Sequence, residues 1–227
     1  MKKVSIVIPA LNEEESIAGT IGSIPLALLK KSGYRTEVII VDNGSTDSTG
    51  KIARAKGAKV ISEPRRGYGN AYKAGFENAT GDFIATGDAD LTYPLEKLPQ
   101  LLRALEEQNL DFITTDRLSN LKSGIMGRTH FFGNTALTTV LNLLFGLKLN
   151  DSQSGMWVFR SAILPRLRLE SSGMPFSQEL KVEAYTKGLR CAEFPIPYRE
   201  RRGKMKLRTF RDGALNLLHL FRKRFFP

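Results

Sequence analysis

The chain has 227 residues, of which 41% are hydrophobic, and a formal net charge of +11. This length and composition suffice for one sizeable core and exclude a chain that is disordered throughout. The single cysteine, Cys191, excludes an intrachain disulfide and agrees with a reducing compartment.

The first half of the chain alternates strand and helix patterns. Near-continuous apolar runs predict buried strands at 4–10, 37–42, 58–62 and 82–90. The segments between them predict helices at 12–29, 45–57 and 67–81. Alternation at this spacing predicts an α/β fold, with a doubly wound, mostly parallel sheet flanked by helices. Ligands of such sheets bind beyond the carboxyl ends of the strands.

The second half is less regular after about residue 115. The apolar stretch 131–147 predicts a helix, and because it contains Asn134 and Asn142 we expect it to be buried or interfacial rather than spanning a membrane. A further helix is predicted at 174–188. No stretch reaches the roughly 18–20 uninterrupted apolar residues of a spanning helix.

The positive charge is concentrated at the C-terminal end. Residues 201–227 contain nine Lys and Arg and one acid, Asp212. The last segment has helical apolar spacing, which predicts an amphipathic helix with His219 and Lys223 on its other side. A basic segment of this kind suits an anionic lipid surface, a nucleic acid or a phosphorylated ligand.

Polar clusters follow three of the predicted strands, at Pro9–Glu13, Asp42–Ser45 and Asp88–Asp90. On an extended segment Asp88 and Asp90 point to the same side, and two neighbouring carboxylates repel unless a cation lies between them. Oxygen ligands of this kind suit Mg²⁺ or Mn²⁺ shared with substrate phosphates. A helix cap or an Asx-turn is the alternative. Three clusters on one edge of one sheet favour a ligand site.

Five ordered blocks carry a resemblance: "VIPALNEEESI", "VIIVDNGSTDST", "RRGYGNAYKAG", "GDFIATGDADLTYP" and "DSQSGMWVFR". They resemble the family 2 glycosyltransferases with the GT-A fold and, more narrowly, the dolichyl-phosphate mannose and glucose synthases. The resemblance covers roughly residues 3–207. It implies a catalytic domain over 1–207, followed by a basic amphipathic helix over 208–227 at a membrane surface.

The resemblance also implies a role for each matching residue. Asp88 and Asp90 would hold the divalent cation, Mg²⁺ or Mn²⁺. The nucleotide would be bound by Pro9, Leu11, Glu13, Asp42, Gly67, Lys73, Asp88 and Ala89. The catalytic set would be Asp90, Asp151, Arg117 and Arg201. The acceptor and its phosphate would be bound by Arg128, Ser154, Arg201 and Lys206.

The chain departs from the family pattern at a few of these positions. Many members have Tyr where this chain has Leu11. Thr92 and Tyr93 stand where the mannose synthases often have Gln and His, and Met205 stands in the place of a Ser. The sequence therefore leaves the sugar and the nucleotide base open.

The function implied is the inverting transfer of a hexose from a nucleoside diphosphate sugar, of the GDP-mannose or UDP-glucose type, to a polyprenyl (dolichyl) phosphate. The partners expected are this donor, the lipid acceptor and the cytoplasmic face of a membrane, with no nucleic acid; the oligomeric state stays open. A phosphate acceptor needs no strong general base. A glycan hydroxyl acceptor is the alternative, with Asp151 or Glu179 as the base. A non-catalytic basic module that binds a membrane or a nucleic acid is a second alternative.

Overall fold

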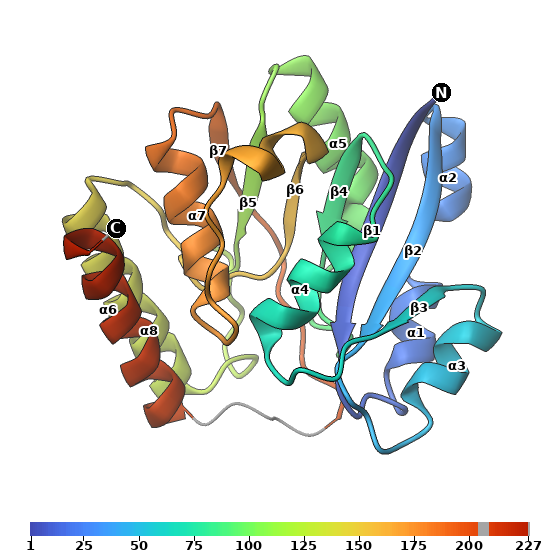
Figure 1. The fold of residues 1–227 in the computed structure, drawn as a ribbon, viewed down its shortest axis with the longest axis horizontal. Helices are drawn as coiled ribbons and strands as arrows, with labels where there is room; N and C mark the ends of the chain where they lie inside the picture. Colours follow the sequence, from blue (N-terminus) through green and yellow to red (C-terminus); the bar gives the residue numbers. More distant parts are fainter. Residues whose placement is uncertain (204–208, 227) are drawn as a thin grey trace.

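In the computed structural model, which describes residues 1–203 and 209–226, the chain forms one sheet with helices on both faces (Figure 1). Its strands are β1 (Lys2–Ala10), β2 (Tyr34–Asp42), β3 (Lys59–Ser62), β4 (Phe83–Thr86), β5 (Phe112–Asp116), β6 (Trp157–Arg160) and β7 (Cys191–Pro195). Its α-helices are α1 (Ile17–Gly22), α2 (Leu26–Lys31), α3 (Thr49–Ala55), α4 (Tyr68–Glu77), α5 (Leu98–Glu107), α6 (Arg128–Phe145), α7 (Phe176–Thr186) and α8 (Thr209–Phe225). Two 3-10 helices, η1 (Leu95–Lys97) and η2 (Ser161–Arg166), complete the described elements.

The strands lie in the order β3-β2-β1-β4-β6-β5-β7. All neighbouring pairs are parallel except the two that β6 makes, which are antiparallel. The predicted mostly parallel α/β sheet is therefore confirmed. The carboxyl ends of the parallel strands meet at the lower edge in Figure 1, and β6 begins at that same edge because it runs the other way.

Two cores lie on the two faces of the sheet. Val4, Ile6 and Ile8 of β1 alternate onto one face, where they pack with buried residues of α1, α2, α3 and α5. Val7 points to the opposite face, where α4 and α7 cover the sheet and Trp157 is fully buried. The near-continuous apolar character of β1 is thus explained by burial on both sides.

The prediction of one helix over 12–29 is wrong, because the structure has two short helices there, α1 and α2. Pro25 precedes α2 and has no backbone N–H to continue the first helix. Asn12 does not cap a helix: its φ is +51°, and Ser16 precedes α1 instead. Helices α3 and α4 lie within their predicted ranges, whereas α5 was not predicted.

Helices α6 and α8 lie side by side at the edge of the molecule next to α7 (Figure 1). A small cluster joins them, with Leu141 of α6, Val182 of α7 and Leu220 of α8 buried in it. Thr138 and Leu141 are the residues of α6 that are fully buried, as expected of an interfacial helix. Among the described residues, no helix is long and apolar enough to cross a membrane.

Candidate functional site

The polar segments of the chain gather at the carboxyl edge of the sheet. Segments following β1, β2, β4, β5 and β7 reach this edge, and residues 151–155 join them because β6 starts there. A cavity of about 300 Å³ opens at this edge, and its lining includes Asp88, Arg117 and Arg201. The structure thus brings together side chains that are far apart in the sequence, as the three strand-end clusters predicted.

Asp90 is almost completely buried and both of its carboxylate oxygens are engaged. Its Oδ1 accepts hydrogen bonds from the backbone N–H of Thr92 at 3.1 Å and from the Thr92 hydroxyl at 2.6 Å. Its Oδ2 lies 2.6 Å from a guanidinium nitrogen of Arg201. Leu91, between Asp90 and Thr92, has a φ of +67°, a conformation that a leucine adopts only under constraint. This tight turn fixes the orientation of the carboxylate.

Asp88 lies beside Asp90 and accepts a hydrogen bond from the Tyr68 hydroxyl at 3.2 Å. Desolvation in the site, together with the charge of Asp90, raises the pKa of Asp88 to about 7. A carboxyl pair with this mutual repulsion is stabilised by a cation. Gly155 makes room for the arrangement, because a Cβ there would lie only 2.3 Å from the Tyr68 hydroxyl oxygen.

The two aspartates fit a divalent cation that is shared with a substrate. Among residues 1–203 and 209–226, no group of three or more His, Cys, Asp and Glu side chains is arranged to hold a metal. At a phosphate-binding site Mg²⁺ is usually held by one or two protein carboxylates, and its remaining ligands come from phosphate and water. The residues present therefore suit a cation that arrives with a diphosphate.

Arg117 supplies a fixed positive charge on the other side of the cavity. Its guanidinium makes two hydrogen bonds to the fully buried Asp151 carboxylate, at 2.6 and 3.0 Å, and lies 5.2 Å from the centre of the Tyr198 ring. Despite burial, the Arg117 charge holds the pKa of Asp151 below its ordinary value, and Asp151 keeps the pKa of Arg117 well above its own. Asp151 is thus a firmly paired carboxylate.

The loop after β7 reaches across the aspartates. The backbone N–H of Arg202 donates to the Asp90 carbonyl at 3.0 Å, and that of Arg199 donates to the Thr92 carbonyl at 3.1 Å. At the end of this loop a Cβ on Gly203 would lie 3.3 Å from the Glu13 carboxylate, and its φ of +91° suits glycine. The loop therefore spans the distance between the aspartate pair and the segment after β1.

Four of the predicted nucleotide residues, Pro9, Leu11, Glu13 and Asp42, lie at the ends of β1 and β2. Asp42 accepts a hydrogen bond from the Ser45 N–H at 2.8 Å, so its side chain closes a turn at the end of β2. Asn43 had no predicted role of its own, yet it ties this turn to the next loop by donating to the Glu63 and Arg65 carbonyls and accepting from the Gly67 N–H. Gly67 has a φ of +136° and a Cβ there would lie 2.2 Å from the Ser172 carbonyl, so a larger residue does not fit.

Several predicted residues take other places. The Ser154 hydroxyl is buried against Thr115, 2.7 Å away, and does not face the cavity. Arg128 is exposed at the start of α6, and the Lys73 amine donates to the Glu170 carbonyl at 3.2 Å. Pro9 and Leu11 are partly exposed at the edge, Glu13 and Ala89 are buried, and Lys206 lies outside the described residues.

The aromatic wall of the cavity and a buried lysine were not predicted. Tyr68, Tyr93 and Tyr198 line the cavity, and the Tyr93 hydroxyl accepts the Gly155 N–H at 2.7 Å. Lys181 of α7 is fully buried next to the 151–155 segment. A lysine in an otherwise helical pattern reads as an exposed residue, so its sequence offered no signal of burial.

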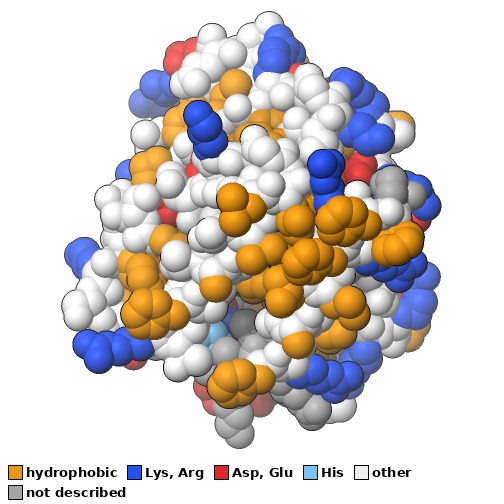
Figure 2. Space-filling view, turned by 90° about the vertical axis from the view of Figure 1, so that its left-hand side faces the viewer, with side chains coloured by type: hydrophobic (Ala, Val, Ile, Leu, Met, Phe, Trp, Pro, Cys, Tyr) orange, Lys and Arg blue, Asp and Glu red, His pale blue; other side chains and the backbone are white. Residues whose placement is uncertain are grey.

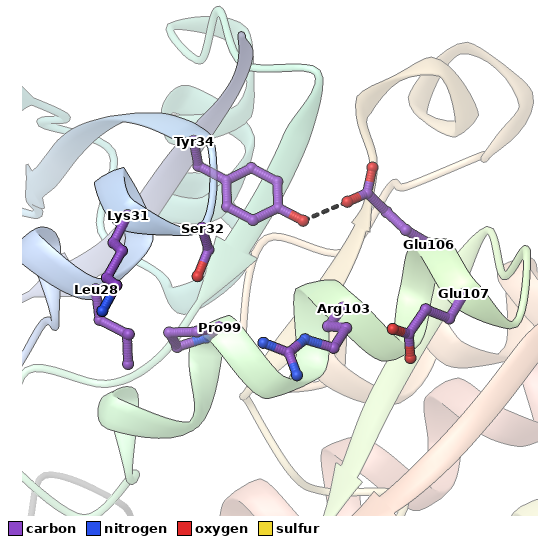
Figure 3. A pocket seen from close by; sticks show the side chains of 8 residues that line it. All are labelled: Leu28, Lys31, Ser32, Tyr34, Pro99, Arg103, Glu106 and Glu107. Carbon is purple, nitrogen blue, oxygen red and sulfur yellow. Dashed lines mark hydrogen bonds between the residues drawn. The ribbon is translucent and has the colours of Figure 1, made fainter.

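A second hollow, of about 440 Å³, lies between α2 and α5 at the opposite edge of the sheet (Figure 3). Tyr34 at the start of β2 points across it and donates a hydrogen bond to Glu106. Burial and the Glu106 carboxylate raise the pKa of Tyr34. Its lining contains none of the predicted site residues, so the candidate site is the cavity at the carboxyl edge.

Comparison with known proteins agrees with this placement. The model of the family "Glycosyl transferase family 2" matches residues 5–168. The low-salt glycan biosynthesis hexosyltransferase Agl6 of Haloferax volcanii is 41% identical over 92% of the chain, but the chain spans only 51% of its length. The dolichyl-phosphate hexose transferase of the same organism is 35% identical, with 93% of this chain and 89% of the relative covered.

Solved structures include one with the same overall fold. The crystal structure of glucosyl-3-phosphoglycerate synthase from Mycobacterium tuberculosis, in complex with phosphoglyceric acid, superimposes with a TM-score of 0.81. The match covers 100% of this chain and 81% of the synthase, at 25% sequence identity.

Proposed function

The chain belongs to glycosyl transferase family 2 and has the GT-A fold, and on this premise we propose that it transfers a hexose from a nucleoside diphosphate sugar to a polyprenyl phosphate, with inversion. One observation carries the proposal: a single cavity joins Asp88 and two arginines, Arg117 and Arg201, to residues of α6 and α8. Carboxylates suit the cation and diphosphate of a donor, and arginines suit an anionic acceptor. The dolichyl-phosphate acceptor named for the Haloferax volcanii relative supports the same choice.

The donor is proposed to bind at the edge between β1, β2 and β4, with its diphosphate next to Asp88 and Asp90. When bound there, a divalent cation, Mg²⁺ or Mn²⁺, supplies the positive charge that stabilises a nucleoside diphosphate as a leaving group. Arg201 lies against Asp90 and is close enough to turn toward the same diphosphate. Its guanidinium would add positive charge where negative charge develops.

The acceptor phosphate is proposed to lie beside Arg117. A phosphate monoester is largely ionised near neutral pH, so its oxygen attacks the sugar without a strong general base. This agrees with the state of Asp151, whose two oxygens are bonded to Arg117 and whose pKa is lowered. In this proposal Asp151 orients Arg117 and does not remove a proton.

The face formed by α6 and α8 is proposed to rest on a membrane, on its cytoplasmic side. Figure 2 shows hydrophobic side chains gathered on this face with Lys and Arg side chains around them. The exposed apolar residues of α6, α8 and the residue after α8 are Phe132, Leu143, Phe210, Leu215, Leu217, Leu218, Phe221, Phe225 and Phe226. Arg211, Arg222 and Arg224 are exposed on α8, and each adds about 1 kcal/mol of attraction near an anionic surface.

The polar side of α8 is held by α7, which leaves the apolar side outward. Lys223 pairs with Glu183 at 2.8 Å, and both Lys223 and His219 lie 3.5 Å from Glu179. Gln178 donates to the Asn216 carbonyl at 2.7 Å. The predicted position of His219 and Lys223 opposite the apolar stripe is confirmed.

We expect the double variant Leu218→Glu/Phe225→Glu to lose binding to anionic lipid vesicles by more than about tenfold, because two large exposed side chains no longer enter the apolar layer. Sedimentation with vesicles containing phosphatidylglycerol measures this. Leu26→Glu/Leu28→Glu, which places the same two charges on exposed leucines of α2, serves as the matched control and should bind as the wild type does. Equal binding by all three proteins would remove the membrane surface from the proposal.

Thermal unfolding with GDP-mannose, UDP-glucose or UDP-N-acetylglucosamine, each with Mn²⁺ or EDTA, tests the donor site. We expect one nucleotide sugar to raise the melting temperature with Mn²⁺ and to lose that effect in EDTA, because a ligand that binds only the folded state stabilises it. Transfer of the same labelled sugar to farnesyl phosphate, and not to a glycan hydroxyl, tests the acceptor. If no nucleotide sugar shifts the melting temperature, the transferase proposal fails.

A further inference from the structure

Lys181 of α7 carries a buried amine behind the cavity, where it contacts the segment 151–155. We propose that Lys181 is a positioning residue, which holds this segment in place and gives the Arg117–Asp151 pair a net positive charge toward the acceptor phosphate. This inference rests on the proposed function and adds a residue that touches neither donor nor acceptor.

The hydrogen bonds of Lys181 require the charged form. Its Nζ donates to the Ser152 carbonyl at 2.7 Å, to the Ser154 carbonyl at 2.6 Å and to the Ser177 hydroxyl at 3.2 Å. The hydroxyl of Ser177 donates its own hydrogen to the Ser154 carbonyl at 2.9 Å, so it acts as an acceptor toward the lysine. All three neighbours are therefore acceptors, and three N–H groups are needed to satisfy them.

The segment that Lys181 holds connects several parts of the site. Asp151 binds Arg117, and the Ser152 N–H donates to Thr138 of α6 at 2.9 Å. The Gly155 N–H donates to the Tyr93 hydroxyl, next to the aspartates. The Lys181 amine, through its two hydrogen bonds to this segment, thus fixes the place where Arg117, α6 and the wall of the cavity meet.

The charge of Lys181 has a consequence beyond packing. Burying an ammonium group is unfavourable, and an apolar side chain of similar length would fill the same volume beside the Trp157 ring without that cost. Arg117 and Asp151 alone form a neutral pair, to which Lys181 adds a positive charge; the Glu193 carboxylate, which accepts the Asn150 and Asp151 N–H groups, offsets that charge in part. A neutral pair offers little attraction to a phosphate dianion, and a cluster with a surplus positive charge attracts it.

The titration of Lys181 agrees with this role. Burial lowers the pKa of Lys181 to about 7, the charges of Asp151 and Glu193 oppose this shift, and the charge of Arg117 adds to it. An anion bound beside Arg117 favours the charged amine, because opposite charges stabilise each other at short range. The bound acceptor phosphate and the positive charge of Lys181 thus stabilise each other.

The test compares Lys181→Met and Lys181→Gln with the wild type, using farnesyl phosphate in detergent as acceptor and inorganic phosphate as a binding probe. Both variants remove the charge, and the glutamine keeps two N–H donors. We expect KM for farnesyl phosphate and Kd for inorganic phosphate to rise roughly tenfold, with KM for the donor unchanged. Lys187→Met, at an exposed lysine at the end of the same helix, is the matched control and should leave all constants unchanged.

The inference is overturned if both variants keep the wild-type KM for farnesyl phosphate and the wild-type Kd for inorganic phosphate. It is also overturned if KM rises equally for donor and acceptor, because that result indicates a general disturbance of the fold. Thermal unfolding checks folding, and Lys181→Gln decides the question if Lys181→Met does not fold. A failure of the proposed function has a different signature, because the wild type would then show no donor binding and no transfer at all.

Discussion

Replacing Asp90 with asparagine is expected to lower the rate of sugar transfer by about 10³-fold, with little change in the folded structure. The substitution keeps the size of the side chain and the acceptor oxygen that binds Thr92, but it removes the charge that faces Arg201 and Asp88. Cation and diphosphate binding should weaken together, because the site has two carboxylates to offer and loses one of them.

The measurement is the transfer rate at saturating donor, together with the Mn²⁺ concentration that gives half of the maximal rate. Asp82→Asn provides the control: Asp82 lies just before the same strand, β4, at the opposite edge of the sheet, where its carboxylate accepts the Lys3 N–H at 2.8 Å. Transfer by Asp90→Asn within tenfold of the wild type would exclude the aspartate pair as the centre of the reaction.

Replacing Asp151 with alanine is expected to destabilise the protein by about 3–5 kcal/mol and to abolish transfer, because it leaves the buried Arg117 charge without its partner. The melting temperature should fall by roughly 10 °C. The pKa of Asp151 is lowered in the folded state, so its contribution is present above its ordinary pKa of about 4 and is lost only as the pH falls below that range.

A double variant separates stability from function at the same pair. Arg117→Met/Asp151→Leu removes both charges, and since apolar residues can replace a buried ion pair with little loss, its melting temperature should return toward that of the wild type. Transfer should stay lost, because the Arg117 guanidinium that receives the acceptor phosphate is gone. A double variant that regains transfer would show that the pair serves stability alone.

The regular parts of this fold follow from the sequence because their determinants are local. The apolar run of β1 and the glycine at Gly57 after α3 predict their elements without knowledge of distant residues. The helix predicted over 12–29 failed for a local reason too, since Pro25 breaks it into α1 and α2. The insertion of β6 between β4 and β5 has no local signal, because its register depends on partners about seventy-five and forty-five residues away.

In the candidate site, too, some features follow from the local sequence and others depend on residues that are distant in the sequence. Asp88 and Asp90 were predicted because their position after a buried strand is visible in the sequence. The pairing of Arg201 with Asp90, and of Arg117 with Asp151, arises only when the fold brings their segments to one edge. Ser154 was predicted to face the acceptor and instead bonds Thr115, which shows that a matching sequence position does not fix the direction of a side chain.

The place of β6 in the sheet also bears on how the protein is made. The strands β3, β2, β1 and β4 can pair as soon as residue 86 has been synthesised, but the neighbour of β4 is β6, which begins at Trp157. At typical rates of translation, β4 keeps an open edge for on the order of ten seconds. During that time Phe83 and Ile84 lie on an edge strand that is paired with β1 on one side and open on the other, which is a template for pairing with another chain. The completed sheet closes only when β6 joins its two parallel halves, so the yield of folded protein should depend on translation speed between these strands.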